Sequence, residues 1–178
     1  SLIFEGGLDP IPRLLFPLGM SALEHKTIRI VPGPGPDIAL PGSAPCFRDG
    51  RLENDFVAVS FGAGGVAQIK DRKSGQDLLA GPMELLCLND ESDTWSHGID
   101  RYAWPIRAKA AFGAPLLVES GPLRTVVRMD GAAGNSPCKL LVELNRQEAA
   151  IHLSLAINYQ EKLSLLKANI ATGHPIQK

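Results

Sequence analysis

The sequence predicts an all-β fold, an antiparallel β-sandwich, from three observations. Glycine and proline, 18 and 14 of the 178 residues, recur at intervals along the chain, as they do at turns between short strands. Apolar and polar residues alternate over 150–159, which predicts a half-buried strand with one apolar face. Short strands separated by closely spaced turns favour a sandwich over a fold with crossover helices.

The chain divides into three stretches. Residues 1–31 combine short apolar runs, Leu14 to Leu18 and Thr27 to Val31, with prolines at 10, 12 and 17 that exclude a long helix. Residues 32–46 are rich in proline and glycine and predict an extended linker or a loop laid over a surface. From residue 47 to residue 178 the pattern predicts the sandwich domain.

Two turns open this domain. The apolar run Phe56 to Phe61 ends in Gly62-Ala63-Gly64-Gly65, and a second run begins at Val66, which predicts a hairpin because glycine supplies the positive φ of a tight reversal. Asp71 and Gly75 then bracket a second turn, in which the aspartate would cap turn amides and the glycine would take the left-handed position.

Later strands follow at short intervals, with a hairpin turn expected over Asn145 to Glu148. The strands are expected at 84–88, 106–112, 116–119, 123–129, 139–144 and 150–159. One helical alternative is a turn or two over 160–168. The residues expected to contribute to apolar packing are Phe56, Val59, Val66, Ile69, Val126, Leu141, Ile151, Leu153 and Leu155.

Charge and composition narrow the classes of function. The formal net charge is −1 and no basic stripe is present, so nucleic acid is not expected as a partner. No apolar run is long enough for a membrane span and no secretory h-region opens the chain, so no membrane partner is expected and a cytoplasmic location is favoured. Cys46, Cys87 and Cys138 are expected to be buried free thiols rather than a disulfide.

The densest polar and aromatic stretch, residues 89–102, is too long for a tight hairpin. Long loops on a rigid sheet scaffold tend to carry function. Trp95 and Tyr102 offer flat faces of the kind that stack on sugar rings, and His97, Asp100 and Arg101 lie beside them. The alternative is structural, with the acidic residues as solvated caps and the tryptophan closing the end of the sandwich.

The polar residues of this loop and of a later strand also allow other chemistry. Asp90, Glu91 and Asp93 could bind calcium, although their spacing is not that of an EF-hand. Asp93 and Asp100 could flank a glycosidic bond, but nothing in their spacing makes them a catalytic pair. Ser96 and His97 are adjacent and lack an orienting acid, which disfavours a nucleophile–base pair, and His152 is expected on a sheet surface. We therefore expect no catalytic residue and no metal site built from this chain alone.

Several segments together resemble the C-terminal β-sandwich region of glycoside hydrolase family 38, the α-mannosidases. Leu52 to Val59 resembles a strand opening L-E-N-E-F, and Glu119 to Arg124 resembles E-x-G-P-L-R. The further similar segments are Gly65 to Gly75 with Asp77 to Leu79, Ser92 to Tyr102, Asn158 to Glu161 and Leu166 to Lys167. Their order over residues 52–167 carries the resemblance. The sequence departs from the family pattern at His97-Gly98 and at Tyr159, where tryptophan is usual.

The resemblance implies a galactose-mutarotase-like supersandwich, incomplete on its C-terminal side, with residues 1–31 as the end of a small preceding β domain. It implies a catalytic α/β domain of the same parent chain as partner, holding zinc and the nucleophile, and a carbohydrate as substrate. Residues 95, 97 and 100–102 would then face the substrate cleft. Two other functions stay open: a stand-alone carbohydrate-binding module, and an aldose-epimerase-like enzyme that needs a histidine and a glutamate facing one sugar pocket.

Overall fold

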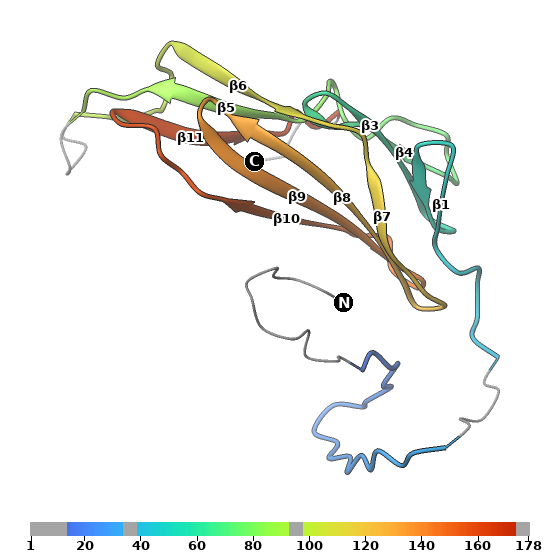
Figure 1. Ribbon diagram of the computed structural model, residues 1–178. Helices are drawn as coiled ribbons and strands as arrows, with labels where there is room; N and C mark the ends of the chain where they lie inside the picture. Colours follow the sequence, from blue (N-terminus) through green and yellow to red (C-terminus); the bar gives the residue numbers. More distant parts are fainter. Residues whose placement is uncertain (1–13, 34–38, 93–97, 174–178) are drawn as a thin grey trace.

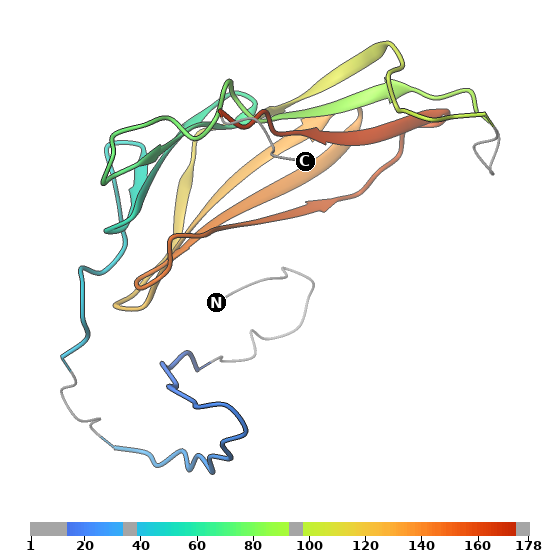
Figure 2. The same cartoon turned by 180° about the vertical axis from the view of Figure 1, so that it is seen from behind.

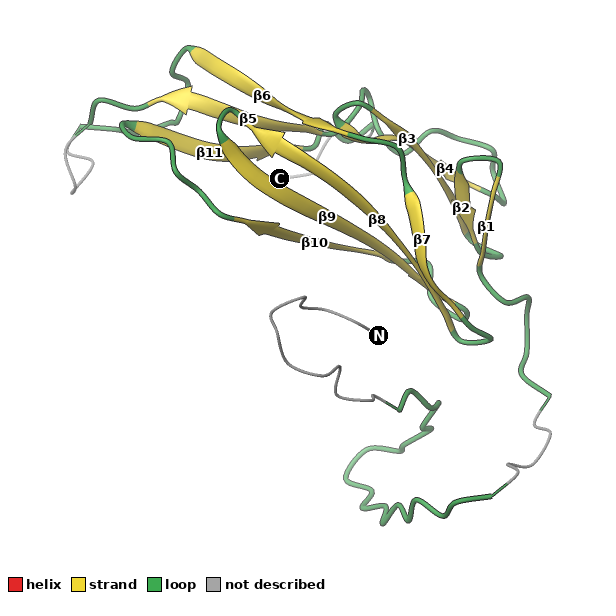
Figure 3. Cartoon of the chain, viewed as in Figure 1, coloured by secondary structure: helices red, strands yellow, loops and turns green. Residues whose placement is uncertain are grey.

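The computed structural model describes residues 14–33, 39–92 and 98–173, and these form strands, turns and coil without a helix (Figure 3). The described residues therefore hold no helix long and apolar enough to cross a membrane. The strands are β1 (Cys46–Arg48), β2 (Arg51–Glu53), β3 (Val57–Gly62), β4 (Gly65–Asp71), β5 (Glu84–Asn89), β6 (Ile106–Phe112), β7 (Leu116–Ser120), β8 (Arg124–Ala133), β9 (Ser136–Asn145), β10 (Ile151–Ile157) and β11 (Ser164–Asn169).

The strands form two antiparallel sheets, which confirms the predicted all-β class. One sheet has the order β1-β2-β3-β4, and the other runs β10-β9-β8-β6-β5-β11, with β7 paired to β8 outside that path. The larger sheet curls, and the small sheet covers it at one end (Figure 1). The view from behind shows β10 and β11 at its two free edges (Figure 2).

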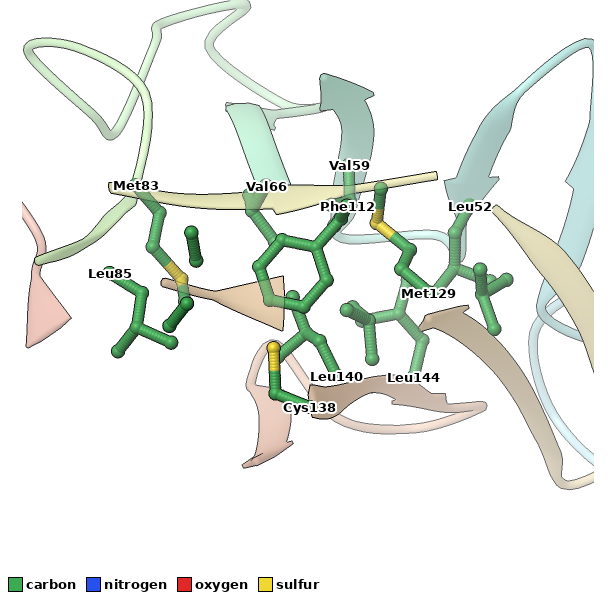
Figure 4. Close-up of a cluster of buried hydrophobic side chains, with 14 of the residues drawn as sticks. Leu52, Val59, Val66, Met83, Leu85, Phe112, Met129, Cys138, Leu140 and Leu144 are labelled. Atoms are coloured by element: carbon green, nitrogen blue, oxygen red, sulfur yellow. The ribbon is translucent and has the colours of Figure 1, made fainter. Parts of the chain in front are cut away.

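Both sheets contribute side chains to one apolar core. Leu52, Val59 and Val66 of the small sheet pack with Phe112, Met129 and Leu140 of the large one (Figure 4). The tip of the β3–β4 hairpin reaches this core, where Gly65 has φ +110° and a Cβ atom would lie 3.0 Å from Leu140. A glycine is therefore required there both by the backbone angle and by the close approach.

The predicted turns match the structure, and the cysteines are free as predicted, although Cys46 is not fully buried. Asp71 Oδ1 accepts the Ser74 amide at 2.6 Å, and Gly75 has φ +73°. The three cysteines are free, with Cys87 and Cys138 buried and Cys46 half-buried. Burial raises the pKa of the Cys87 and Cys138 thiols, which keeps them protonated.

One alternative is excluded and two expectations about packing, for Phe56 and Leu141, need correction. Residues 164–169 form strand β11 rather than helix, because their backbone pairs along the whole of β5. Phe56 is exposed because it lies in the turn between β2 and β3, outside both strands. Leu141 points to the outer face, since its neighbours Leu140 and Val142 occupy the core face of β9.

Strand β10 follows the predicted face but not the predicted burial. Ile151, Leu153, Leu155 and Ile157 lie opposite buried residues of β9, so they share the core face. Ile151 and Ile157 pack against the core, whereas Leu153 and Leu155 stay 36% and 38% exposed. The large sheet ends at β10, and in the described residues no further strand covers these two leucines.

The start of the domain is fastened to the sandwich by side chains. Arg146, in the β9–β10 turn, donates to the carbonyl oxygens of Leu40 at 2.8 Å, Pro41 at 2.9 Å and Gly42. Asp55 accepts the Ser43 amide at 2.7 Å, and this bond lowers the pKa of the carboxyl group. Residues 40–43 therefore run along the surface beside the β9–β10 turn.

Candidate functional site

The predicted functional loop connects β5 to β6 at the end of the sandwich remote from the small sheet (Figure 1). Backbone bonds fix its base: Asn89 donates to the carbonyl of Pro105, and Asp90 to that of Leu163, both at 2.9 Å. Lys167 of β11 reaches the Tyr102 carbonyl at 3.1 Å. These bonds hold the two ends of the loop on β5 and β11.

The structure places only part of the predicted site. Asp100, Arg101 and Tyr102 are exposed at the surface, whereas Trp95 and His97 lie outside the described residues. Tyr102 stacks at an angle on Trp104, with ring centroids 5.3 Å apart and the planes inclined by 59°. The described half of the loop is thus an aromatic pair flanked by a carboxylate, a guanidinium and the Lys167 ammonium group.

Trp104 is the residue that the sequence reasoning missed. It is half-buried, one residue before Pro105, and it supports the exposed ring of Tyr102. The available signal was that Tyr102 and Trp104 are two positions apart, shortly before a predicted strand. This spacing puts both rings at the same end of the sheet.

The acidic part of the loop makes local bonds. Asp90 Oδ1 accepts the Ser92 amide at 2.9 Å and the Ser92 hydroxyl at 2.5 Å, and Glu91 accepts from Asn89 at 3.1 Å. Asp93, proposed both as a calcium ligand and as a partner of Asp100, lies outside the described residues. In the part of the chain with described coordinates, no three His, Cys, Asp or Glu side chains gather as a metal site.

A separate pocket lies at the other end of β5. It has a volume of about 450 Å³ and is walled by the β3–β4 hairpin, Met83, the start of β5 and the end of β6. At its rim Lys109 Nζ donates to Glu84 Oε1 at 2.5 Å, and this bond, with a second from Asn169, lowers the pKa of Glu84. The pocket is mainly apolar and is separated from Tyr102 by the length of the strand.

His152 lies on the outer face of β10, as predicted. Its Nε2 is 2.9 Å from Glu148 Oε2, and both side chains are nearly half exposed. The contact raises the pKa of His152, while bonds from Asn145 and then His152 lower the pKa of Glu148. The pair forms a surface ion contact rather than a catalytic pocket.

Comparison with protein families decides the identity of the domain. The model of the glycosyl hydrolases family 38 C-terminal domain matches residues 52–175. The chain belongs to this family. A search of curated proteins found no match.

The family 38 match contains a polar anchor at Asn54. This side chain is buried, and its Nδ2 donates to the carbonyl oxygens of Asn145 and Glu148, both at 2.8 Å. Its Oδ1 accepts the amides of Phe56 and Val57 at 2.9 Å. One amide group therefore shapes the β2–β3 turn and ties it to the β9–β10 turn.

A second motif of the family 38 domain closes the β7–β8 hairpin. Arg124 Nε and Nη2 donate to the two oxygens of Glu119 at 2.9 and 2.7 Å, and Nη1 lies 3.4 Å from Glu143. The two-pronged geometry fits a guanidinium to a carboxylate. These contacts join β7, β8 and β9 on the outer face.

A third motif residue, Glu161, caps the β8–β9 turn. Its carboxylate accepts the Asn135 amide at 2.6 Å and lies 3.7 Å from Arg107 Nη2. Gly134, with φ +63°, leaves the room that the carboxylate occupies, since a Cβ there would lie 2.6 Å from Glu161 Oε1. Like Asn54 and Arg124, this residue serves the fold.

Proposed function

We propose that this family 38 domain is the supporting β-sandwich of an α-mannosidase and forms part of the substrate cleft there. The protein would hydrolyse α-mannosidic bonds, with the catalytic residues and zinc in an α/β domain outside these 178 residues. The observation that carries this proposal is the family match together with the loop at 98–104, in which Asp100, Arg101 and Tyr102 are exposed. Tyr102 offers a flat face to a sugar ring, and Asp100 and Arg101 offer groups that bind hydroxyls.

The described residues do not fit zinc themselves. They hold no gathering of three or more His, Cys, Asp or Glu side chains, and a catalytic zinc needs three protein ligands. We therefore assign no catalytic step to the described residues. The isolated chain is expected to be inert toward aryl α-mannosides with or without added zinc, and turnover that disappears on Asp100→Ala would contradict this.

The test of the proposal uses the full-length protein that contains this domain. Asp100→Ala and Tyr102→Ala should each lower turnover of an α-mannoside about tenfold or more, because contacts to the substrate that strengthen in the transition state are lost. Asp77→Ala is the matched control, since Asp77 is an exposed carboxylate whose ion-pair distance to Lys70 is 3.9 Å. Equal turnover in all three variants would reject the loop as part of the cleft.

A stand-alone carbohydrate-binding module is the second candidate, favoured by the exposed ring of Tyr102 stacked on Trp104. It predicts that the isolated chain binds mannose oligosaccharides in calorimetry and that Tyr102→Ala abolishes the binding heat. The epimerase-like alternative gains no support in the described residues: His152 and Glu148 meet on an open surface, and the residues lining the pocket include Glu84 but no histidine.

A further inference from the structure

The free edge of β10 exposes apolar side chains on the core face of the large sheet. Leu153 lies opposite Val142, and Leu155 lies opposite Leu140, and both partners are buried. Directly opposite residues point to the same side of a sheet, so the two leucines belong to the interior. An edge strand with unpaired backbone groups and apolar side chains is a template for a further strand.

A segment with the matching pattern lies earlier in the same chain. Thr27 to Val31 alternates Ile28 and Ile30 with Thr27 and Arg29, which is the pattern of a strand with one apolar face. In the structure this segment is coil, drawn apart from the sandwich, and Ile28 and Ile30 are 48% and 72% exposed (Figure 1). Contact between these isoleucines and the exposed leucines of β10 would remove apolar surface of both from water, which is favourable.

The connection between them is short and anchored beside β10. Arg146 holds residues 40–42 at the β9–β10 turn, next to the first residue of β10, Ile151. The eight residues 32–39 span at most about 28 Å when extended. Val31 can therefore reach the beginning of β10, and the segment before it would then run back along the strand.

We propose that Thr27–Val31 adds to the free edge of β10 as an antiparallel strand. Ile30 would lie opposite Leu153 and Ile28 opposite Leu155, so that four apolar side chains cover one another on the core face. Arg29 would fall opposite Ser154 on the outer face, where Glu143 and Glu148 supply carboxylates around His152. The segment would complete the edge of the sheet that the described strands leave open.

Hydrogen exchange of the full chain tests this pairing. Backbone amides of residues 27–31 should exchange at least about tenfold more slowly than those of an unstructured segment. The double variant Ile28→Lys/Ile30→Lys should remove that protection and speed exchange in β10. Leu23→Lys is the control, because Leu23 is 99% exposed and precedes the segment, and it should change neither. Exchange of residues 27–31 at the unstructured rate would overturn the proposal.

A cysteine pair tests the register independently of those variants. In a Cys46→Ser background, Ile30→Cys with Leu153→Cys should form an intramolecular disulfide, because directly opposite residues come within disulfide distance. Leu23→Cys with Leu153→Cys should form at least about tenfold less. Equal yields would overturn the proposal. Cross-linked dimers, or protection of β10 that depends on protein concentration without protection of residues 27–31, would assign the edge to a second copy instead.

Discussion

Asn54 and the loop at 98–104 both lie within the family 38 match, yet their side chains serve different purposes. All the polar side-chain atoms of Asn54 are bonded, and two of its partners are 91 and 94 residues away in sequence. In the loop, Asp100, Arg101 and Tyr102 are exposed, and the bond that holds Tyr102 to β11 uses its backbone carbonyl. A motif residue of the first kind specifies the fold, while one of the second kind is available to a ligand.

The difference explains why resemblance motifs alone do not locate a site. Asn54, Arg124 and Glu161 belong to segments that resemble the family, and each bonds to its own domain. Exposed loop side chains without such bonds contribute little to stability, so their loss should be small. Stability measurements can therefore separate the two regions before any substrate is known.

The largest loss is expected for Asn54→Ala. The substitution leaves two turn carbonyls and two amides without their buried partner, which should cost about 3–5 kcal/mol in the free energy of unfolding. Urea denaturation of the isolated chain measures it. Asn158→Ala is the control, because Asn158 is exposed after β10, and it should stay within about 0.5 kcal/mol. A similar small effect for Asn54 would remove it from the structural group.

Leu140→Ala should cost about 3 kcal/mol, since Leu140 is buried at the centre of the core (Figure 4). Leu153 shares the core face but lies on the edge strand, so Leu153→Ala should cost about 1 kcal/mol if the edge stays open, and more if Thr27–Val31 covers it. Denaturation of both variants checks the difference. Equal losses would mean that the edge is covered as fully as the centre.

Arg124→Met should cost about 1–2 kcal/mol, because the loss of the guanidinium leaves Glu119 and Glu143 close together without a cation. Adding Glu119→Gln to this variant should recover part of the loss. Arg128→Met serves as the control, since Arg128 makes a single 3.2 Å contact with Asp130, and it should change stability by less than about 0.5 kcal/mol.

Much of this fold could be predicted from sequence because its signals are local. The glycines at 62–65, the aspartate and glycine of the 71–75 turn, and the alternation in β10 each act within a few residues. Strand β11 was not predicted, since the alternative of a helix over 160–168 is excluded only by pairing with β5, some eighty residues earlier. The exposure of Leu153 also depends on sheet order, which periodicity does not encode.

The candidate site was only partly predictable for the same reason. Asp100, Arg101 and Tyr102 were identified by composition, and the structure places them at one end of the sandwich. The stacking of Trp104 on Tyr102 and the reach of Lys167 from β11 depend on which strands border the loop. Trp95 and His97 stay predictions, outside the described residues.

The His152–Glu148 contact should give a small pH dependence. The raised pKa of His152 stabilises the fold fully below the usual value of 6.5 and loses this effect as pH rises through the folded-state pKa. The lowered pKa of Glu148 stabilises above the usual 4.5 and loses its effect as pH falls. Between these values His152→Gln should therefore be less stable than the unsubstituted chain, by less than about 0.5 kcal/mol because solvent screens both groups. Melting temperatures at pH 5.5 and pH 8 should differ between the two proteins only at the lower pH.

The smallest effects are expected in the loop, where Asp100→Ala and Arg101→Ala should leave the melting temperature of the isolated chain almost unchanged. Both side chains are exposed, and substitutions at such positions stay within about 0.5 kcal/mol. Trp95→Ala decides between the two interpretations of the loop: a small change fits a ligand-facing tryptophan, whereas a loss of about 3–5 kcal/mol would identify a side chain that closes the sandwich end. A large loss in both Trp95→Ala and Asp100→Ala would place the loop with Asn54 as a structural element. Side chains that stabilise the domain this strongly are packed or bonded within it and are not available to a ligand. A large loss for Trp95 alone would leave Asp100 and Tyr102 as the part of the loop that a sugar can contact.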